Sequence, residues 1–429
     1  MKKYILIILC CLTSFPLWSY NVNMIVEHYS VDQGLPNNTV NCTLKDRDGF
    51  IWFGTWYGLC CFDGVKFKTF NKQEHDSDVP PRKIQRIVED KNGYIWVKTI
   101  DRKLYVFNKV TECFHAVYDD MKNYSENIQV IKLQNTAEGD VLLLTKDKNL
   151  LLAGVDEKGQ VTIKILFDSR DEINKHDYTL KHHVLCETEE YISWIGTDYK
   201  VSAVHKGAEL ASRPADFITS KINSGDKDSF TSFFEDGRKV WVGDRAGIFY
   251  SIDVRTGLVN RYVLSEIKGA ISNLLVTPAG YVYLSVTGQG TYEYDLAERR
   301  LQKINTEMND AMVTHAFIDQ YDKIWFHENE KALIYYDPLN HTAKRFPFTM
   351  FGKITTLYSE DAGERGLFFL SPAGEAWLFD REHAEMVYIN KLKQLSNDRA
   401  NQQFYHLMLD NDGVLWLSSA DEGGYCMNF

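Results

Sequence analysis

The sequence has few prolines, no surplus of positive charge and no long hydrophobic run. Only 9 of 429 residues are proline, whereas 13% are aromatic, a composition that favours β-structure because flat side chains pack well on a pleated sheet. The formal net charge is −11, and no block of basic residues is present. Direct binding to nucleic acid or to an anionic lipid surface is therefore not expected. Neutral sugars and other proteins fit better as partners.

Only the first twenty residues have the pattern of a targeting segment. Lys2 and Lys3 precede the short apolar run 4–12, and Pro16 interrupts the chain before a small residue, Ser19. We interpret residues 1–20 as a signal peptide that is removed on export. The apolar run is too short for a comfortable membrane span, and no later stretch is apolar enough for one.

The eight cysteines do not indicate a redox or metal centre. Two lie in the signal peptide, and the other six form no CxxC pair and no zinc spacing. His176, His182 and His183 share one polar segment, but their spacing also matches no zinc motif. We expect the cysteines to be small buried hydrophobic residues, and we expect neither a metal nor a cofactor.

A short pattern recurs along the whole chain. It reads DRDGFIW at 46–52, DKNGYIW at 90–96 and DNDGVLW at 410–416, with weaker copies between them. The spacing between copies is 42 to 52 residues, which is typical of a repeat protein. The central aromatic or apolar residues of the nine copies are Trp52, Trp96, Leu142, Trp194, Trp241, Tyr283, Trp325, Phe368 and Trp416.

Each copy predicts four short strands. In the first, strands are expected at 40–44, 51–53, 59–62 and 67–70, with a turn at Asp46–Gly49 between the first two. A four-stranded antiparallel unit of about 45 residues is a β-propeller blade, so the expected fold class is all-β. The central tryptophans should pack between blades. The Asp-x-Asp-Gly segments should be turns, because they lack the later ligands of a calcium loop.

Two segments resemble a known family. HYSVDQGLPNNTV at 28–40 and DRDGFIWFGTWYGLCCFDGVKFKTF at 46–70 are similar to the two-component regulator propeller repeat. This repeat builds the periplasmic sensor region of hybrid two-component histidine kinases in Bacteroidetes. The resemblance implies a periplasmic protein that senses glycan-derived oligosaccharides and controls polysaccharide-utilisation genes. Family members place a membrane helix and a kinase after their propellers. This sequence contains neither, so membrane attachment and kinase activity are expected only through a longer parent.

The resemblance also guides the domain prediction. Family members carry two seven-bladed propellers in tandem, which predicts a seven-bladed ring over residues 21–345 and the first blades of a second, incomplete ring over 346–429. The alternative is a single ring of eight or nine blades. In a ring of nine, the strand near residues 25–30 would complete the last unit.

Candidate ligand-binding residues lie in the loops between the second and third strands. Propeller topology places these loops at one end of the ring, where a rigid scaffold holds aromatic and polar groups of the kind that bind sugars. The candidates are Trp56, Tyr57, Asp101, Arg102, Asp198, Tyr199, Asp244, Arg245, Gln289, Glu328 and Asn329.

These loops predict non-catalytic binding of an oligosaccharide. A protein-interaction scaffold is the alternative, and a second copy of the chain is kept as a possible partner. A glycoside hydrolase or lyase is a third hypothesis, because Asp101, Asp244 and Glu328 could supply a carboxylate pair. The sequence shows no local pairing of a nucleophile with a base, so no catalytic residue is assigned.

Overall fold

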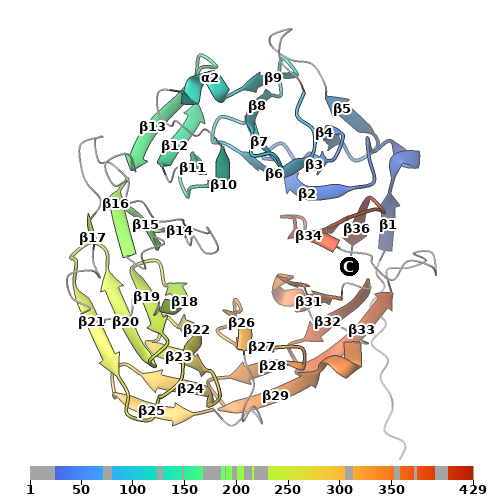
Figure 1. Cartoon of the computed structure of the whole chain (residues 1–429). Helices are drawn as coiled ribbons and strands as arrows, with labels where there is room; N and C mark the ends of the chain where they lie inside the picture. The colour runs from blue at the N-terminus through green and yellow to red at the C-terminus, as the bar shows by residue number, and fades with distance from the viewer. Residues whose placement is uncertain are drawn as a thin grey trace, which may run out of the picture.

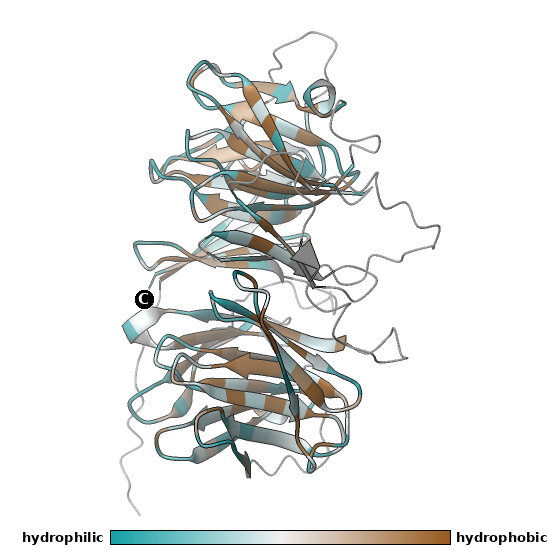
Figure 2. Cartoon of the chain, turned by 90° about the vertical axis from the view of Figure 1, so that its left-hand side faces the viewer, coloured by the Kyte–Doolittle hydropathy of each residue, from teal (hydrophilic) through white to brown (hydrophobic). Residues whose placement is uncertain are grey.

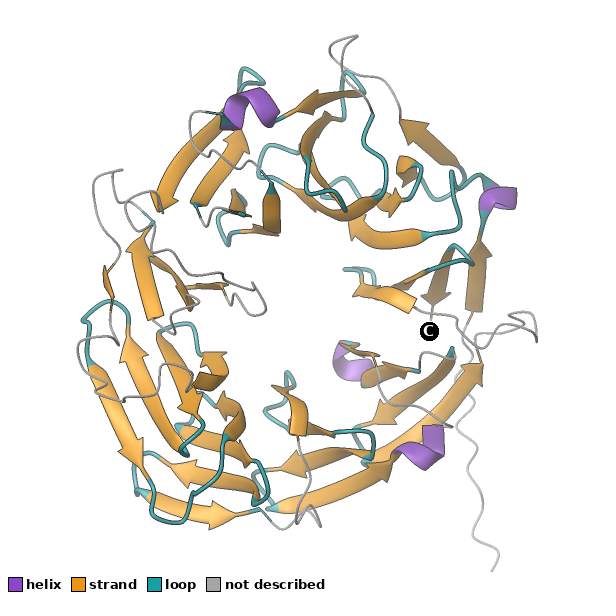
Figure 3. Cartoon of the chain, in the orientation of Figure 1, coloured by secondary structure: helices purple, strands orange, loops and turns teal. Residues whose placement is uncertain are grey.

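The protein is almost entirely β-sheet (Figure 3). The computed structural model describes residues 25–70, 80–122, 129–146, 149–167, 185–188, 190–195, 201–206, 215–216, 230–304, 313–351, 358–371, 374–391 and 404–428. The predicted signal peptide, residues 1–20, lies outside this part of the chain. Within it, the helical elements are short: η1 (Val31–Gln33), α2 (Tyr118–Met121), η3 (Phe348–Phe351) and η4 (Gly363–Arg365). No helix of the described residues is long and apolar enough to cross a membrane.

The described strands form nine four-stranded antiparallel sheets, called blades 1 to 9 here. Blade 1 contains β2 (Val40–Lys45), β3 (Ile51–Thr55), β4 (Gly58–Phe62) and β5 (Phe67–Phe70). Blade 2 contains β6 (Ile84–Glu89), β7 (Ile95–Thr99), β8 (Leu104–Asn108) and β9 (Cys113–Ala116). Blade 3 contains β10 (Val130–Asn135), β11 (Val141–Thr145), β12 (Leu150–Val155) and β13 (Val161–Phe167). Blade 4 contains β14 (Leu185–Glu187), β15 (Tyr191–Ile195), β16 (Val201–His205) and β17 (Ala215–Asp216).

The later blades have the same composition. Blade 5 contains β18 (Phe230–Glu235), β19 (Lys239–Asp244), β20 (Ile248–Asp253) and β21 (Val259–Val263). Blade 6 contains β22 (Ile271–Val276), β23 (Tyr281–Val286), β24 (Gly290–Asp295) and β25 (Arg300–Lys303). Blade 7 contains β26 (Val313–Ile318), β27 (Ile324–Glu328), β28 (Ala332–Asp337) and β29 (Thr342–Pro347). Blade 8 contains β30 (Tyr358–Asp361), β31 (Leu367–Leu370), β32 (Glu375–Asp380) and β33 (Glu385–Lys391). Blade 9 contains β34 (Phe404–Leu409), β35 (Leu415–Ser419), β36 (Gly424–Asn428) and, from the other end of the chain, β1 (Ile25–Tyr29).

The blades stand around a central axis and form a β-propeller (Figure 1). Many strand residues are hydrophobic (Figure 2). Nine clusters of buried side chains each join two successive blades. Between blades 1 and 2, for example, the rings of Trp52 and Phe107 are 5.5 Å apart. Between blades 9 and 1, those of Trp416 and Phe53 are 6.0 Å apart. A single twisted sheet cannot cover both of its faces, and the ring solves this problem for each blade. The all-β propeller prediction is confirmed.

The structure departs from the predicted division of the chain at residue 345. Trp325 of blade 7 and Phe379 of blade 8 pack edge-on, with their centroids 4.6 Å apart, so the packing continues across this point. The pairing of β1 with β36, from Ile25 opposite Asn428 to Tyr29 opposite Gly424, then completes blade 9. The described strands therefore follow the arrangement kept as the alternative, one ring of nine blades, instead of rings over 21–345 and 346–429.

The central residues of the nine copies all fall in the second strand of a blade. The Asp-x-Asp-Gly segments are turns, as predicted. Asp46 accepts hydrogen bonds through Oδ1 from the Asp48 and Phe50 amides, at 3.0 and 2.9 Å, and Gly49 has a positive φ of 91°. Asp46 Oδ2 also accepts a bond from the indole Nε1 of Trp52, at 2.7 Å. The same Asp–Trp bond, 2.8–3.2 Å long, occurs at Asp90–Trp96, Asp236–Trp241, Asp319–Trp325 and Asp410–Trp416.

Candidate functional site

The loops between the second and third strands meet the entry segments of the next blades. The Lys83 amide donates to the Trp56 carbonyl, at 2.9 Å, and the Val130 amide donates to the Arg102 carbonyl, at 3.0 Å. Each bond joins the loop of one blade to the segment that begins the next. Because every blade has the same strand order, these loops lie at one end of the ring, which we call the top face.

Trp56 and Tyr57 offer aromatic surface on the top face. They form the turn between β3 and β4, and their side chains are 39% and 64% exposed. The Lys83 ammonium lies 5.0 Å from the centre of the Trp56 ring, so the ring is supported from one side by the next blade. An aromatic face beside a hydrogen-bond donor is a suitable surface for a sugar ring.

Several other predicted residues are also accessible on this face. Asp101, Arg245 and Asn329 are exposed, and Arg102 is half-buried. Burial alone would raise the pKa of Asp101, but the Thr99 hydroxyl and the nearby lysine outweigh it and hold the pKa below its usual range. Asp101 is therefore an ionised acceptor. The predicted residues Asp198 and Tyr199 lie outside the described residues.

Three predicted residues use their polar groups in contacts with other parts of the chain. Asp244 is buried and accepts two backbone amide bonds of its own turn, at 2.9 and 2.8 Å. Burial raises the pKa of Asp244. Gln289 bonds the backbone at 266 and 268, and buried Glu328 forms an ion pair of 2.9 Å with Arg345. The contacts of these three residues indicate a role in shaping the face, and a ligand would have to displace those contacts to reach them.

A second set of polar residues, which was not predicted from the sequence, lies on the inner strands. In seven of the described blades the first strand shifts register against the second at its top end, as a β-bulge does. The residues that follow the shift are Cys42, Arg86, Lys132, Ser232, Asn273, His315 and His406. Most are polar, so the bulges place hydrogen-bonding groups around the axis at the top face.

Some side chains at the bulges fasten one blade to the next. Asn41 Nδ2 donates to the Ile84 carbonyl of blade 2 at 2.6 Å. Asn273 Nδ2 donates to the Val313 carbonyl of blade 7 at 2.7 Å. In blade 5, Thr231 Oγ1 reaches blade 6 in the same way.

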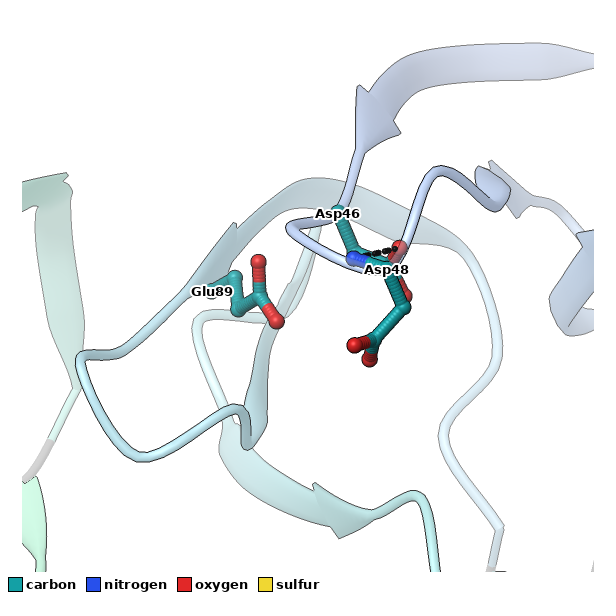
Figure 4. Close-up of side chains that lie close together, drawn as sticks. All are labelled: Asp46, Asp48 and Glu89. Atoms are coloured by element: carbon teal, nitrogen blue, oxygen red, sulfur yellow. Dashed lines mark hydrogen bonds between the residues drawn. The ribbon is translucent and has the colours of Figure 1, made fainter.

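An acidic group on the opposite end of the ring is already neutralised. The carboxylates of Asp46, Asp48 and Glu89 approach one another in the turns of blades 1 and 2 (Figure 4). The Lys109 ammonium lies between them, 2.8, 2.9 and 2.7 Å from their respective oxygens. The lysine thus occupies the position that a cation would take, and it ties blade 1 to blade 2.

A cavity of about 630 Å³ also opens at this opposite end, between the turns of blades 7, 8 and 9. Its acidic lining groups serve contacts between blades. Asp361 pairs with Arg381 at 2.7 Å, and Asp410 pairs with Lys45 at 3.3 Å. We therefore favour the top face as the functional surface, because its aromatic groups and several of its polar groups are exposed and not engaged in this way.

The geometry defines a β-propeller with an aromatic and polar top face. Residues 34–57 match the family model described as two component regulator propeller, which confirms the resemblance found in blade 1. No curated protein sequence matches the chain.

Solved structures with a related strand arrangement include two from B. thetaiotaomicron. One is the extracellular domain of BT4673, described as a hybrid two component system, with 14% identity and a TM-score of 0.35 over 93% of this chain and 65% of that one. The other is the extracellular domain of BT3049, described in the same way, with 15% identity and a TM-score of 0.36 over 92% and 58%. The chain thus spans less than two thirds of their length. Virginiamycin B lyase from Staphylococcus aureus matches at 9% identity and a TM-score of 0.37, over 95% and 99%.

Proposed function

We propose that the chain is the periplasmic ligand-sensing region of a hybrid two-component signalling protein. In this proposal it binds a glycan-derived oligosaccharide without cleaving it, and a longer parent converts binding into expression of polysaccharide-utilisation genes. The single observation that carries the proposal is the family match at residues 34–57, which ends at the exposed pair Trp56 and Tyr57. The matched repeat therefore contributes directly to the top face.

A binding role fits the contacts better than a catalytic one. A glycosidase needs two available carboxyl groups at a fixed separation. Of the three acids considered, Asp244 and Glu328 are buried and engaged in turn and ion-pair contacts, which leaves Asp101 exposed. Aromatic stacking with hydrogen bonds from neighbouring turns requires no such pair.

Signalling would require that the ligand prefer one arrangement of the protein over another. Loops of successive blades are joined by backbone bonds such as Lys83 to Trp56, so a ligand that spans two loops would bear on the geometry between blades. A second copy of the chain, or the remainder of the parent, would receive this change. Membrane attachment in this proposal also belongs to the parent.

The test is calorimetric titration of the purified protein with a panel of oligosaccharides from plant and host glycans. We expect one class to bind, and we expect Trp56→Ala with Tyr57→Ala to weaken binding at least about tenfold, or ~1.4 kcal/mol. Phe50→Ala is the matched control, because Phe50 is similarly exposed, at 41%, on a turn between first and second strands. Binding unchanged by the double substitution would place the ligand elsewhere. Absence of heat with every oligosaccharide would favour a protein-interaction scaffold, and cleavage of the bound sugar would show an enzyme.

A further inference from the structure

Blade 2 carries two positive charges directly opposite each other. Arg86 on β6 and Lys98 on β7 are cross-strand partners, immediately after the register shift that begins at Ile84. Like charges in this position destabilise a sheet. None of the other six shifted blades pairs two lysine or arginine residues at the corresponding positions; blade 5, for example, pairs Ser232 with Gly243, and blade 7 pairs His315 with His327. The pair in blade 2 is therefore not a requirement of the fold.

Lys98 is also buried, with 6% of its surface exposed. Its ammonium donates one hydrogen bond, to Gln85 Oε1 at 2.5 Å. Burial, followed by the charges of Arg102 and Arg86, lowers the pKa of Lys98 to about 8. Removing a lysine from water without a counter-charge is costly, and here two further cations increase that cost.

No carboxylate among the described residues forms an ion pair with Arg86, Lys98 or Arg102. Asp101 is next to Arg102 in sequence, but its oxygens contact the Thr99 hydroxyl and the Lys103 ammonium, the latter at 3.4 Å. Other basic residues with mostly buried side chains do form ion pairs. Five whose side chains are 15–18% exposed each have a carboxylate oxygen within 2.8 Å: Lys45, Lys109, Lys206, Lys323 and Arg381. Although the chain has a net charge of −11, Lys98 in blade 2 is the only buried lysine of the described residues, and no carboxylate forms an ion pair with it.

Arg86 belongs to β6, the inner strand of blade 2. Arg86 helps to lower the pKa of His406 on the inner strand of blade 9, so its charge is close to that strand. His406 Nδ1 is 3.1 Å from the hydroxyl of Thr43 on the inner strand of blade 1. The surroundings of Arg86 therefore offer hydrogen-bonding groups from three blades. A guanidinium can hold two oxygens of one anion, and a lysine adds a point charge.

We infer that Arg86, Lys98 and Arg102 form an oxyanion-binding site at the top end of the inner strands. Its ligand is a sulfate, phosphate or carboxylate group, either free or as a substituent of a larger molecule. Gln85 positions the Lys98 ammonium beside the exposed guanidinium of Arg86. The site does not depend on the proposed oligosaccharide function, although Arg102 belongs to the same face.

The inference is tested by titrating the protein with sodium sulfate, sodium phosphate and sodium glucuronate, against sodium chloride at equal ionic strength. We expect at least one of the three to raise the thermal unfolding midpoint above the chloride value and to bind in calorimetry. Lys98→Met should abolish the anion-dependent shift, and it should leave the protein without anion at least as stable as the wild type. Lys303→Met, at an exposed position on β25, should keep the full shift.

Arg86→Gln provides a second variant that does not disturb a buried position, and it should weaken anion binding at least tenfold. The inference is overturned if no anion exceeds chloride, or if both variants keep the wild-type shift. It is also overturned if Lys98→Met is markedly less stable than the wild type in chloride while Arg86→Gln binds normally. If no anion binds but a neutral oligosaccharide still binds to both variants, the anion site is rejected and the proposed function is retained. Loss of oligosaccharide binding in the Trp56 and Tyr57 variant, with anion binding intact, would separate the two sites.

Discussion

In the turns between first and second strands that begin with an aspartate, this aspartate should contribute more stability where it also joins two blades. Asp46 has a side chain with no exposed surface, and the Lys109 ammonium of blade 2 lies 2.8 Å from it. Its oxygens also accept two turn amides and the Trp52 indole. Asp46→Ala would leave the indole N–H without its acceptor and remove one of three carboxylates around Lys109. Loss of a buried ion-pair partner together with an unsatisfied donor is expected to cost about 3–4 kcal/mol.

Asp236 provides the comparison within the same protein. It accepts two turn amides and the Trp241 indole, the latter at 2.8 Å, but it forms no ion pair with the described residues. Asp236→Ala should therefore cost less, about 1–2 kcal/mol. Both variants are measured by urea unfolding followed by tryptophan fluorescence and circular dichroism. Equal losses of stability, or a larger loss at Asp236, would refute the view that the lysine bridge between blades adds to the turn contacts.

Two further predictions concern buried charged or titratable groups. Glu328→Gln should lower the free energy of unfolding by about 3 kcal/mol, because Glu328 is buried and pairs with Arg345 at 2.9 Å. The same substitution should leave oligosaccharide binding unchanged. Urea unfolding tests the first expectation, and calorimetry tests the second. Burial, together with the charge of Arg86, lowers the pKa of His406 to about 4. Between about pH 6.5 and pH 4, His406 therefore binds a proton in the unfolded chain but not in the folded protein. Stability should then fall as the pH drops from about 6.5 to about 4, and Arg86→Gln should raise the pKa of His406 in an NMR titration. A His406 signal that titrates near 6.5 in both proteins would contradict this.

The repeat could be predicted from sequence because its signals are local. The turn at Asp46–Gly49 requires a side-chain acceptor and a positive φ, and both residue types are visible in the pattern. The packing of Trp52 between blades follows from its place in the second strand. The Asp–Trp hydrogen bond could also have been anticipated, since six residues separate the partners in four blades, beginning with Asp46 and Trp52.

Features that depend on distant strands could not be derived in the same way. The closure of the ring requires β1 to pair with β36 across nearly the whole chain, and no local pattern distinguishes this from the start of another ring. A bulge is a relation between two strands, so the register shift at Ile84 is invisible in either strand alone. The solvent-facing role expected of Asp244 and Glu328 depended on loop position, whereas their burial depends on residues elsewhere in the blade.

One signal for the anion site was present in the sequence. Aligned on the central tryptophan, the second strands read IWFGT, IWVKT, SWIGT, VWVGD, IWFHE and LWLSS, so Lys98 stands where the other five have glycine, serine or histidine. None of the other eight copies has a lysine or an arginine at this position, so Lys98 is a departure that the fold does not explain. Comparing the copies with one another, in addition to recognising them, would have identified it.

The closed ring of nine blades is the central claim, and a disulfide tests it most directly. Glu27 on β1 lies opposite Cys426 on β36, and Cys426 is a free thiol. Substitution Glu27→Cys should create a pair that oxidises to a disulfide between the two ends of the chain, detected by mass spectrometry of unreduced peptides and absent when Cys426→Ser is added. If the introduced thiol and that of Cys426 both remain free in the Glu27→Cys variant, under conditions that oxidise exposed thiols, the result would contradict the ring.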